Sequence, residues 1–440
     1  MPSRICFAMQ DGQHLNLLKL RRAFVSFLLA KKTRGTFIFR IENIHDKKQF
    51  ELNKPIHALD QLNWLGLLPD ESPLNPNSNF APYVQNERLA IYTRYAESLL
   101  SSGAAYKKTI ANENNLAGNL HSAIYLKMTG ISEGFSDLLR GKISSNQLNT
   151  DDWVIFNSDG SPSSQFARII DDHLMNITHV VSEERYLPNV SKYLSLCRAL
   201  NWTYPFFIHL PDMKNSSEVN DMQLVTFLHN EGYLPEAILN YLYQLDINET
   251  DKGKILSLSD IVNAFEIKNL HFGKRVFTLE ALQKINGLLI KNTNDVGYRT
   301  LVRPFISSFV NETFSDEYLY KLAFLYKTQI SYGAQLNDYF APFLMSNPNF
   351  TPAELQLINS PESQAVVKAL KTRLETEDET LENIKAIISD VQKTTCLSGK
   401  SFFLPIRLLL TRLSHGAEID EIIKFLGKEE VLRRLCQDKD

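Results

Sequence analysis

The chain has 440 residues, of which 44% are hydrophobic and 22% are charged, and its formal net charge is −3. These values are typical of a globular protein with two or three domains, and they exclude a generally basic surface for nucleic acid, so any RNA contact must use local clusters of lysine and arginine. The four cysteines lie far apart and form no CxxC pair, so no metal site is predicted.

The N-terminal region predicts a strand, a buried helix and a second strand. Arg4–Met9 is a short apolar run, Leu15–Lys32 carries apolar residues on most faces, and Thr36–Glu42 is rich in β-branched and aromatic residues. Such a βαβ unit has a right-handed crossover and binds ligands beyond the carboxyl ends of its strands. We therefore expect residues 9–18 and Glu42 to surround one crevice.

The next part of the chain predicts helices over Leu52–Leu65 and Glu87–Leu100, joined by a Pro/Asn/Ser-rich loop from Leu68 to Pro82. Residues 106–150 indicate an inserted subdomain of short strands. Residues 153–170 predict strands on either side of a turn.

Beyond about residue 250 the apolar spacing favours helices with little strand signal. The predicted helices are Leu279–Lys291, Asp316–Tyr326, Thr351–Ile358, Ser363–Thr376, Leu381–Gln392, Ile419–Phe425 and Lys428–Leu435. The fold class expected from the whole pattern is therefore α/β followed by all-α.

Five segments, in the correct order, resemble those of glutamyl-tRNA synthetases, which are class I aminoacyl-tRNA synthetases: Phe37–Glu42, Asn63–Leu67, Gln85–Tyr92, Asp171–Val180 and Gly232–Ala237. The resemblance implies a Rossmann catalytic domain split over residues 1–105 and 151–210, with an acceptor-end-binding insertion at 106–150. It further implies a helical stem-contact region at 211–310 and a helical anticodon-binding domain of the bacterial type at 311–440.

The first phosphate-binding signature of that family is altered. Where the family has a histidine and two glycines at the start of a helix, this chain has Asn16, Leu18 and Lys19. Glycine lets the adenine approach bare backbone, and donors at a helix N-terminus hold phosphates, so Leu18 is expected to fill the volume of the base. His14 remains an alternative source of the lost imidazole after a local shift.

The second signature is altered as well. Counting back from Gly232, the family's critical lysine is Glu218 in this chain, within Asn215–Val219. Losing one such donor costs about 10²- to 10³-fold in rate, and a carboxylate adds repulsion from a triphosphate. Lys214 is the alternative that a shifted loop would bring to the same place.

The amino-acid pocket implied by the resemblance has also changed. The family's arginine that forks onto the substrate carboxylate is Ser182 here, its tyrosine is Ser164, the serine of its first loop is Gln10, and a further arginine is Cys6. An aromatic position holds Tyr186. The remaining substrate contact of the family is Glu42, which would otherwise pair with Arg40 or Lys31, so the pocket is expected to lack cations.

These losses favour a glutamyl-tRNA synthetase-like protein that is catalytically inactive, needs no cofactor, and binds tRNA, that of glutamate by resemblance, or a translation-associated protein. The alternative is a divergent glutamate–tRNA ligase with residual or altered activity, which would use ATP and Mg²⁺. A third interpretation is an interaction protein that no longer binds RNA. The candidate tRNA contacts are Arg140, Lys142, Lys274, Arg275, Lys400 and Arg407.

The sequence gives no reason to expect a membrane or DNA partner. It contains no run near the roughly 18 apolar residues of a membrane span, and Met1–Arg4 leads directly into the first predicted strand. We therefore expect a cytoplasmic protein.

Overall fold

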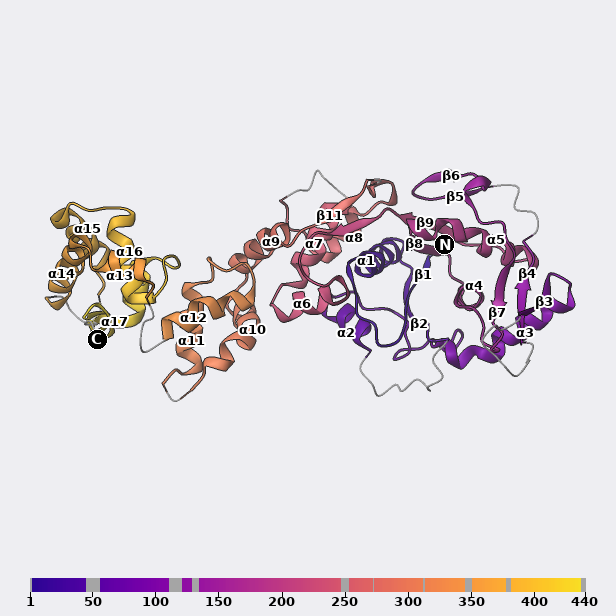
Figure 1. Cartoon of the computed structure of the whole chain (residues 1–440), viewed down its shortest axis with the longest axis horizontal. Coiled ribbons are helices and arrows are strands. Elements are labelled where there is room, and N and C mark those ends of the chain that lie inside the picture. The colour runs from indigo at the N-terminus through magenta and orange to yellow at the C-terminus, as the bar shows by residue number, and fades with distance from the viewer. Residues whose placement is uncertain are drawn as a thin grey trace. The chain divides into compact units, whose positions relative to one another are not determined.

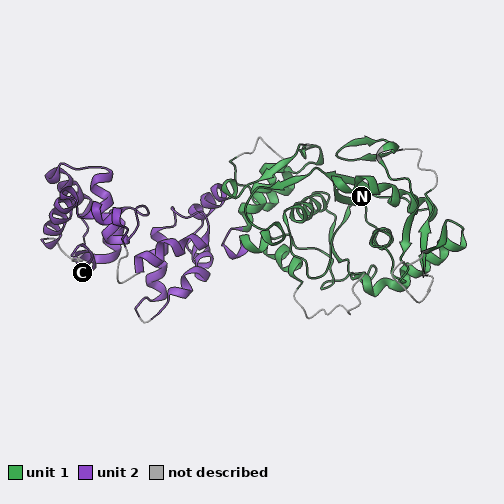
Figure 2. Ribbon diagram, in the orientation of Figure 1, with its two compact units in different colours: residues 1–228, 235–282 green, residues 229–234, 283–440 purple. Residues whose placement is uncertain are grey.

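The computed structural model describes residues 2–44, 56–110, 121–128, 134–246, 253–271, 273–311, 313–344, 350–376 and 381–436 (Figure 1). The chain forms two compact units, one made of residues 1–228 and 235–282 and the other of residues 229–234 and 283–440 (Figure 2). The finer domain boundaries expected from the sequence stay predictions.

The first unit is built on the predicted βαβ motif. Strands β1 (Arg4–Met9) and β2 (Thr36–Ile41) pair in parallel, with Arg4 opposite Thr36, and helix α1 (Leu17–Lys32) connects them. Most of α1 is buried, and so are five of the six residues of β2, as expected for elements that read as nearly continuous apolar runs. This prediction is confirmed.

Four further strands complete a sheet with the order β2-β1-β8-β9-β5-β6. Strands β8 (His179–Glu183), β9 (Phe206–Leu210) and β5 (Phe135–Asp137) run parallel to the first two, and β6 (Gly141–Ile143) pairs antiparallel with β5. Strands β5 and β6 come from the segment expected to be a separate insertion, so part of it extends the central sheet.

A second, antiparallel sheet contains β3 (Ala105–Ile110), β4 (His121–Leu126) and β7 (Trp153–Phe156). The strand predicted after the turn that follows β7 is wrong, because helix α4 (Ser164–Leu174) occupies that segment. The Ser163 hydroxyl accepts a hydrogen bond from the Phe166 amide and so caps the helix. Apolar residues of α4 also recur at helical spacing.

Helices and short strands surround these sheets. Helix α2 (His57–Trp64) confirms the second part of the predicted Leu52–Leu65 helix, whose first residues lie outside the described ranges, and α3 (Leu89–Ser101) confirms the next. The others are α5 (Val190–Ala199), β10 (Met213–Asn215), α6 (Leu224–Asn230), α7 (Pro235–Asp246), α8 (Leu258–Ala264) and β11 (Arg275–Phe277).

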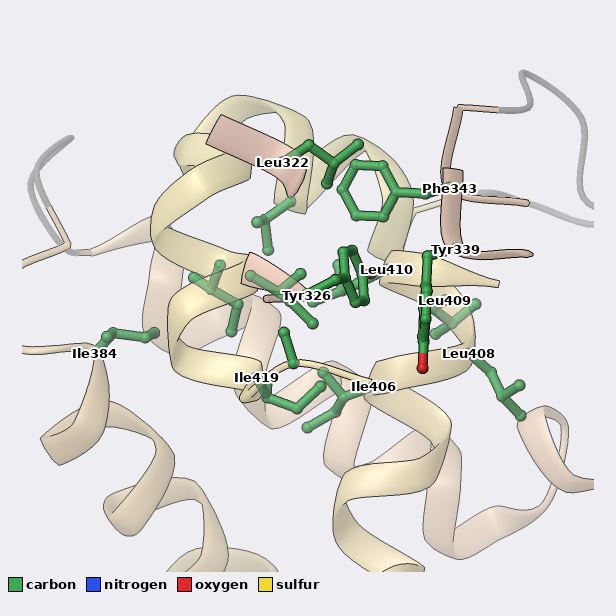
Figure 3. Close-up of a cluster of buried hydrophobic side chains, with 14 of the residues drawn as sticks. Leu322, Tyr326, Tyr339, Phe343, Ile384, Ile406, Leu408, Leu409, Leu410 and Ile419 are labelled. Carbon is green, nitrogen blue, oxygen red and sulfur yellow. The ribbon is translucent and has the colours of Figure 1, made fainter. Parts of the chain in front are cut away.

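The distal part is helical, as predicted. Its elements are α9 (Leu279–Asn292), α10 (Asp295–Ile306), α11 (Asp316–Leu325), α12 (Leu336–Leu344), α13 (Pro352–Ile358), α14 (Pro361–Glu375), α15 (Ile384–Thr395), α16 (Lys400–Thr411) and α17 (Ile419–Leu435). The two helices predicted at the end are separated by a kink at Gly427, whose φ is 78°. Side chains such as Leu322, Phe343, Leu410 and Ile419 form the buried core of the second unit (Figure 3).

No helix in the described ranges is both long and apolar enough to cross a membrane. In the same ranges, no cluster of three or more His, Cys, Asp and Glu side chains is arranged to hold a metal ion.

Candidate active site

Two neighbouring aspartates fix helix α4 beneath the crevice at the carboxyl ends of the parallel strands. The carboxylate of Asp171 is buried and accepts hydrogen bonds from Arg88 Nε at 2.7 Å, the Tyr92 hydroxyl at 2.9 Å and Gln85 Nε2 at 3.0 Å. Because every donor comes from α3 or the turn before it, this carboxylate joins α3 to α4. The segment that resembles the family thus has a structural role here.

Asp172 extends the network towards Glu42. Its Oδ1 lies 2.9 Å from Arg40 Nη1, and Arg40 Nη2 lies 3.1 Å from Glu42 Oε1. Arg168, one helical turn before Asp172 on α4, donates to both oxygens of Glu42 at 2.9 Å. The Glu42 carboxylate is therefore held between two guanidinium groups, and the predicted pairing with Arg40 is confirmed, whereas Lys31 pairs with Asp70 instead.

These charges keep Glu42 ionised. Burial alone would raise the pKa of its carboxyl, but Arg168 and Arg40 outweigh burial and lower the pKa to about 2. The same interaction raises the pKa of Arg168 above its ordinary value. The site therefore holds a permanent ion pair at any pH near neutrality.

A cavity of about 180 Å³ opens above this pair. It brings together four of the residues expected in the amino-acid pocket, namely Glu42, Ser164, Ser182 and Tyr186. Ser182 is on β8 and Ser164 begins α4, so the cavity lies at the carboxyl end of the sheet where the βαβ unit predicts a ligand site.

The expectation that this pocket lacks cations is wrong. Arg22, from α1, and Arg168, from α4, both line the cavity. These arginines do not lie at the positions that hold the cations in the family, so the changes at Ser182 and Cys6 do not reveal them. The sequence feature that indicates Arg22 is its position in a helix whose other residues are mostly apolar and buried.

Gln10 and Cys6 do not belong to this cavity. The side chain of Gln10 is exposed and accepts a hydrogen bond from Gln13 Nε2 at 2.6 Å. Cys6 lines a separate, smaller cavity of about 20 Å³ beside Arg40 and Asp172, and burial raises the pKa of its thiol to about 12. Neither side chain replaces the family contact expected at its position.

The residues of the first signature loop are used to hold the loop itself. Asn16 caps α1, since its side-chain oxygen accepts from the Lys19 amide at 2.9 Å, and Lys19 Nζ donates to Gln13 Oε1 at 2.6 Å. His14 stacks on His57 with 4.6 Å between ring centroids. The His14 Nδ1 atom also lies 3.2 Å from the hydroxyl of Thr226.

The second signature segment is a short strand followed by a turn. In β10, Lys214 is paired with Val276, and the Asn215 side-chain oxygen accepts from the Ser217 amide at 3.0 Å. The side chains of Lys214 and Glu218 are exposed. Their roles, like those of Asn16, Leu18 and Lys19, stay predictions.

The six tRNA-contact candidates differ in their freedom to bind phosphate. Lys142, Lys274 and Lys400 are exposed. Arg140 is engaged with the His209 carbonyl at 3.0 Å and with Glu184 at 2.9 Å, and Arg407 donates to the Ala417 carbonyl at 2.7 Å. Arg275, in β11, is partly buried.

The parallel sheet, its ligand crevice and the helical distal unit together define a class I aminoacyl-tRNA synthetase fold. Residues 13–118 and 118–284 match the family described as "tRNA synthetases class I (E and Q), catalytic domain", and residues 298–437 match "Anticodon binding domain".

Individual relatives agree. The chain is 31% identical to the glutamate–tRNA ligase of Acholeplasma laidlawii over 98% of this chain and 96% of that protein, and 29% identical to that of Finegoldia magna over 98% of both. Its fold is similar to the crystal structure of a glutamate tRNA ligase from Elizabethkingia meningosepticum, with a TM-score of 0.82 at 24% identity over 99% and 98% of the two chains. The protein therefore belongs to the glutamate–tRNA ligase family.

Proposed function

We propose that this protein is a divergent glutamate–tRNA ligase, which binds tRNA and an acidic amino acid and joins them far more slowly than relatives with both signatures intact. The observation that carries the proposal is the cavity that holds Glu42 together with Arg22 and Arg168. A pocket with a carboxylate for an ammonium group and an arginine for a carboxylate has the chemistry that an acidic amino acid requires.

The activation step explains why the reaction should be slow. It requires ATP and Mg²⁺, and the residues at the nucleotide position fit them poorly, because Leu18 takes the place of a glycine and Glu218 that of a lysine. Lys19 supplies a cation nearby, although burial and the neighbouring Arg22 lower its pKa. Loss of one preorganised cation corresponds to a rate about 10²- to 10³-fold lower.

The test is glutamate-dependent exchange of pyrophosphate into ATP and charging of tRNA with labelled glutamate, each measured with and without tRNA. We expect slow but saturable activity that Glu42→Gln abolishes and that Glu97→Gln, at an exposed position on α3, leaves unchanged. Absence of exchange above the enzyme-free background, with tRNA still retained on a filter, would refute the ligase proposal.

A second candidate is a protein that binds tRNA or a translation partner without ligating an amino acid. The observation that favours it is the exposed carboxylate of Glu218 at the position of the transition-state lysine. Under this proposal, retention of tRNA falls steeply with salt, as expected for phosphate contacts through Lys142, Lys274 and Lys400. A weak, salt-independent retention equal to that of unrelated RNA would exclude the ligase and the tRNA-binding form of the second candidate.

A further inference from the structure

Two adjacent arginines on α1 have opposite environments. Arg21 is fully buried and pairs with both oxygens of Asp246, at 2.7 Å from Nε and 2.6 Å from Nη2, while its Nη1 donates to the Pro211 carbonyl. Successive residues of a helix point about 100° apart, so Arg22 faces another direction. That direction is the cavity above Glu42.

Arg22 is anchored, but no carboxylate within the described ranges forms a direct ion pair with it. Its Nη2 donates to the Ala8 carbonyl at 2.9 Å, and its guanidinium lies 5.0 Å from the centre of the Phe7 ring. Among the carboxylates of the described residues, none forms an ion pair with Arg22. Burial and the like charge of Arg168 lower the pKa of this guanidinium, and the nearby carboxylates of Glu183 and Glu42 offset this only in part. An anion that contacts Arg22 directly would therefore be stabilised.

The other cations of the site already have counter-ions. Arg168 donates twice to Glu42, and Arg40 is paired with Asp172 and Glu42. A guanidinium has five N–H donors, and one of those of Arg22 is used on the Ala8 carbonyl. Arg22 therefore retains donors for a planar, two-oxygen acceptor, which is the shape of a carboxylate.

Glu42 retains one place for a donor. Its two oxygens accept three hydrogen bonds, two from Arg168 and one from Arg40. A carboxylate offers about four lone-pair sites, so one remains for an ammonium group. The site thus combines a cation that has no direct ion-pair partner among the described residues with a carboxylate that can accept one more hydrogen bond, which suits a zwitterion that carries an additional carboxylate.

We infer that Arg22 is the specificity-determining residue of this pocket, and that it binds a carboxylate of an acidic amino acid and so discriminates glutamate from glutamine. The inference rests on the proposed function, because it names the residue that selects the amino acid there. It does not depend on ATP, on tRNA or on catalysis.

The experiment is calorimetric titration of the full chain with L-glutamate, L-aspartate and L-glutamine in the absence of ATP. We expect an acidic amino acid to bind and L-glutamine to bind at least about tenfold more weakly, because a neutral amide cannot replace a charge-assisted contact. Arg22→Gln should weaken binding of the acidic ligand by about 10- to 100-fold and remove the preference over L-glutamine. Arg22→Lys keeps the charge without the planar guanidinium, so its affinity for the acidic ligand should lie between those of the unaltered protein and Arg22→Gln.

The matched control is Arg94→Gln on α3, which removes an equal charge from an exposed position and should leave binding unchanged. The inference is overturned if no acidic amino acid binds, if L-glutamine binds as well as L-glutamate, or if Arg22→Gln binds like the unaltered protein. If Arg22→Gln does not fold, the inference is tested instead by the affinity of Arg22→Lys and by the comparison of L-glutamate with L-glutamine. Binding that depends on Arg22 without pyrophosphate exchange would refute ligase activity and leave this inference intact.

Discussion

Replacing Glu42 with glutamine should destabilise the first unit in a way that depends on pH. The side chain keeps its shape, but the carboxylate between Arg168 and Arg40 becomes neutral. Folding lowers the pKa of Glu42 from its ordinary value of 4.5 to about 2. Such a change contributes about 3 kcal/mol to the free energy of unfolding near neutral pH, because each tenfold change in proton affinity corresponds to about 1.4 kcal/mol.

The sign follows from which state binds the proton more tightly. Because the folded pKa is the lower one, the contribution of Glu42 is fully present above about pH 4.5 and is lost as the pH falls towards 2. The difference in unfolding free energy between the unaltered protein and Glu42→Gln should therefore shrink from about 3 kcal/mol at pH 6 to about 1 kcal/mol at pH 3.

Urea unfolding at several pH values measures this difference. A probe in the first unit is needed, because two compact units need not unfold in one step. The exposed substitution Glu97→Gln serves as the control and should change stability by less than about 0.5 kcal/mol at every pH. A difference for Glu42→Gln that does not vary between pH 3 and pH 6 would refute the reasoning.

Asp246→Ala should cost about 3 to 5 kcal/mol, because it leaves Arg21 buried without its counter-ion; urea unfolding checks this, and a loss below 1 kcal/mol, on the order of an exposed pair, would contradict it. Gly333→Ala should destabilise the second unit by about 1 to 3 kcal/mol, since an added Cβ would lie 2.3 Å from Phe305 Cε2. Phe305→Leu should restore part of that stability in thermal unfolding. Glu218→Lys should raise the rate of pyrophosphate exchange by roughly tenfold or more, and an unchanged rate would show that this position does not face the phosphates.

Local pattern was sufficient to predict most elements of the fold. Strands β1 and β2 and the helix between them occur where continuous apolar runs place them, because elements buried on all sides need little from distant residues to be recognised. The strand predicted after β7 was wrong because that segment is not a continuous apolar run. A turn rich in glycine and serine fits a hairpin as well as a helix start, and the Ser163 cap and the helical spacing of the apolar residues after it distinguish the two.

The candidate site was predicted less completely than the fold. Glu42, Ser164, Ser182 and Tyr186 line one cavity because each lies near the carboxyl end of a parallel strand or at the start of α4. Their roles in binding stay predictions. Gln10 does not line that cavity because its side chain points to solvent, where it accepts a hydrogen bond from Gln13. The direction of a side chain in an irregular loop depends on such short contacts, which spacing along the chain does not determine.

Arg22 and Arg168 show that a cavity can contain arginines even where the positions that hold arginine in the family have lost it. Arg21 and Arg22 are neighbours in sequence, but within the described part of the chain Arg21 alone of the two has a paired counter-ion, Asp246, which lies 225 positions away. Likewise, Arg168 reaches Glu42 across 126 positions. A cavity can therefore contain arginines from two helices even where the strand positions that hold arginine in the family have lost it. The ligand that it accepts depends on all the charges around the cavity and not on the aligned positions alone.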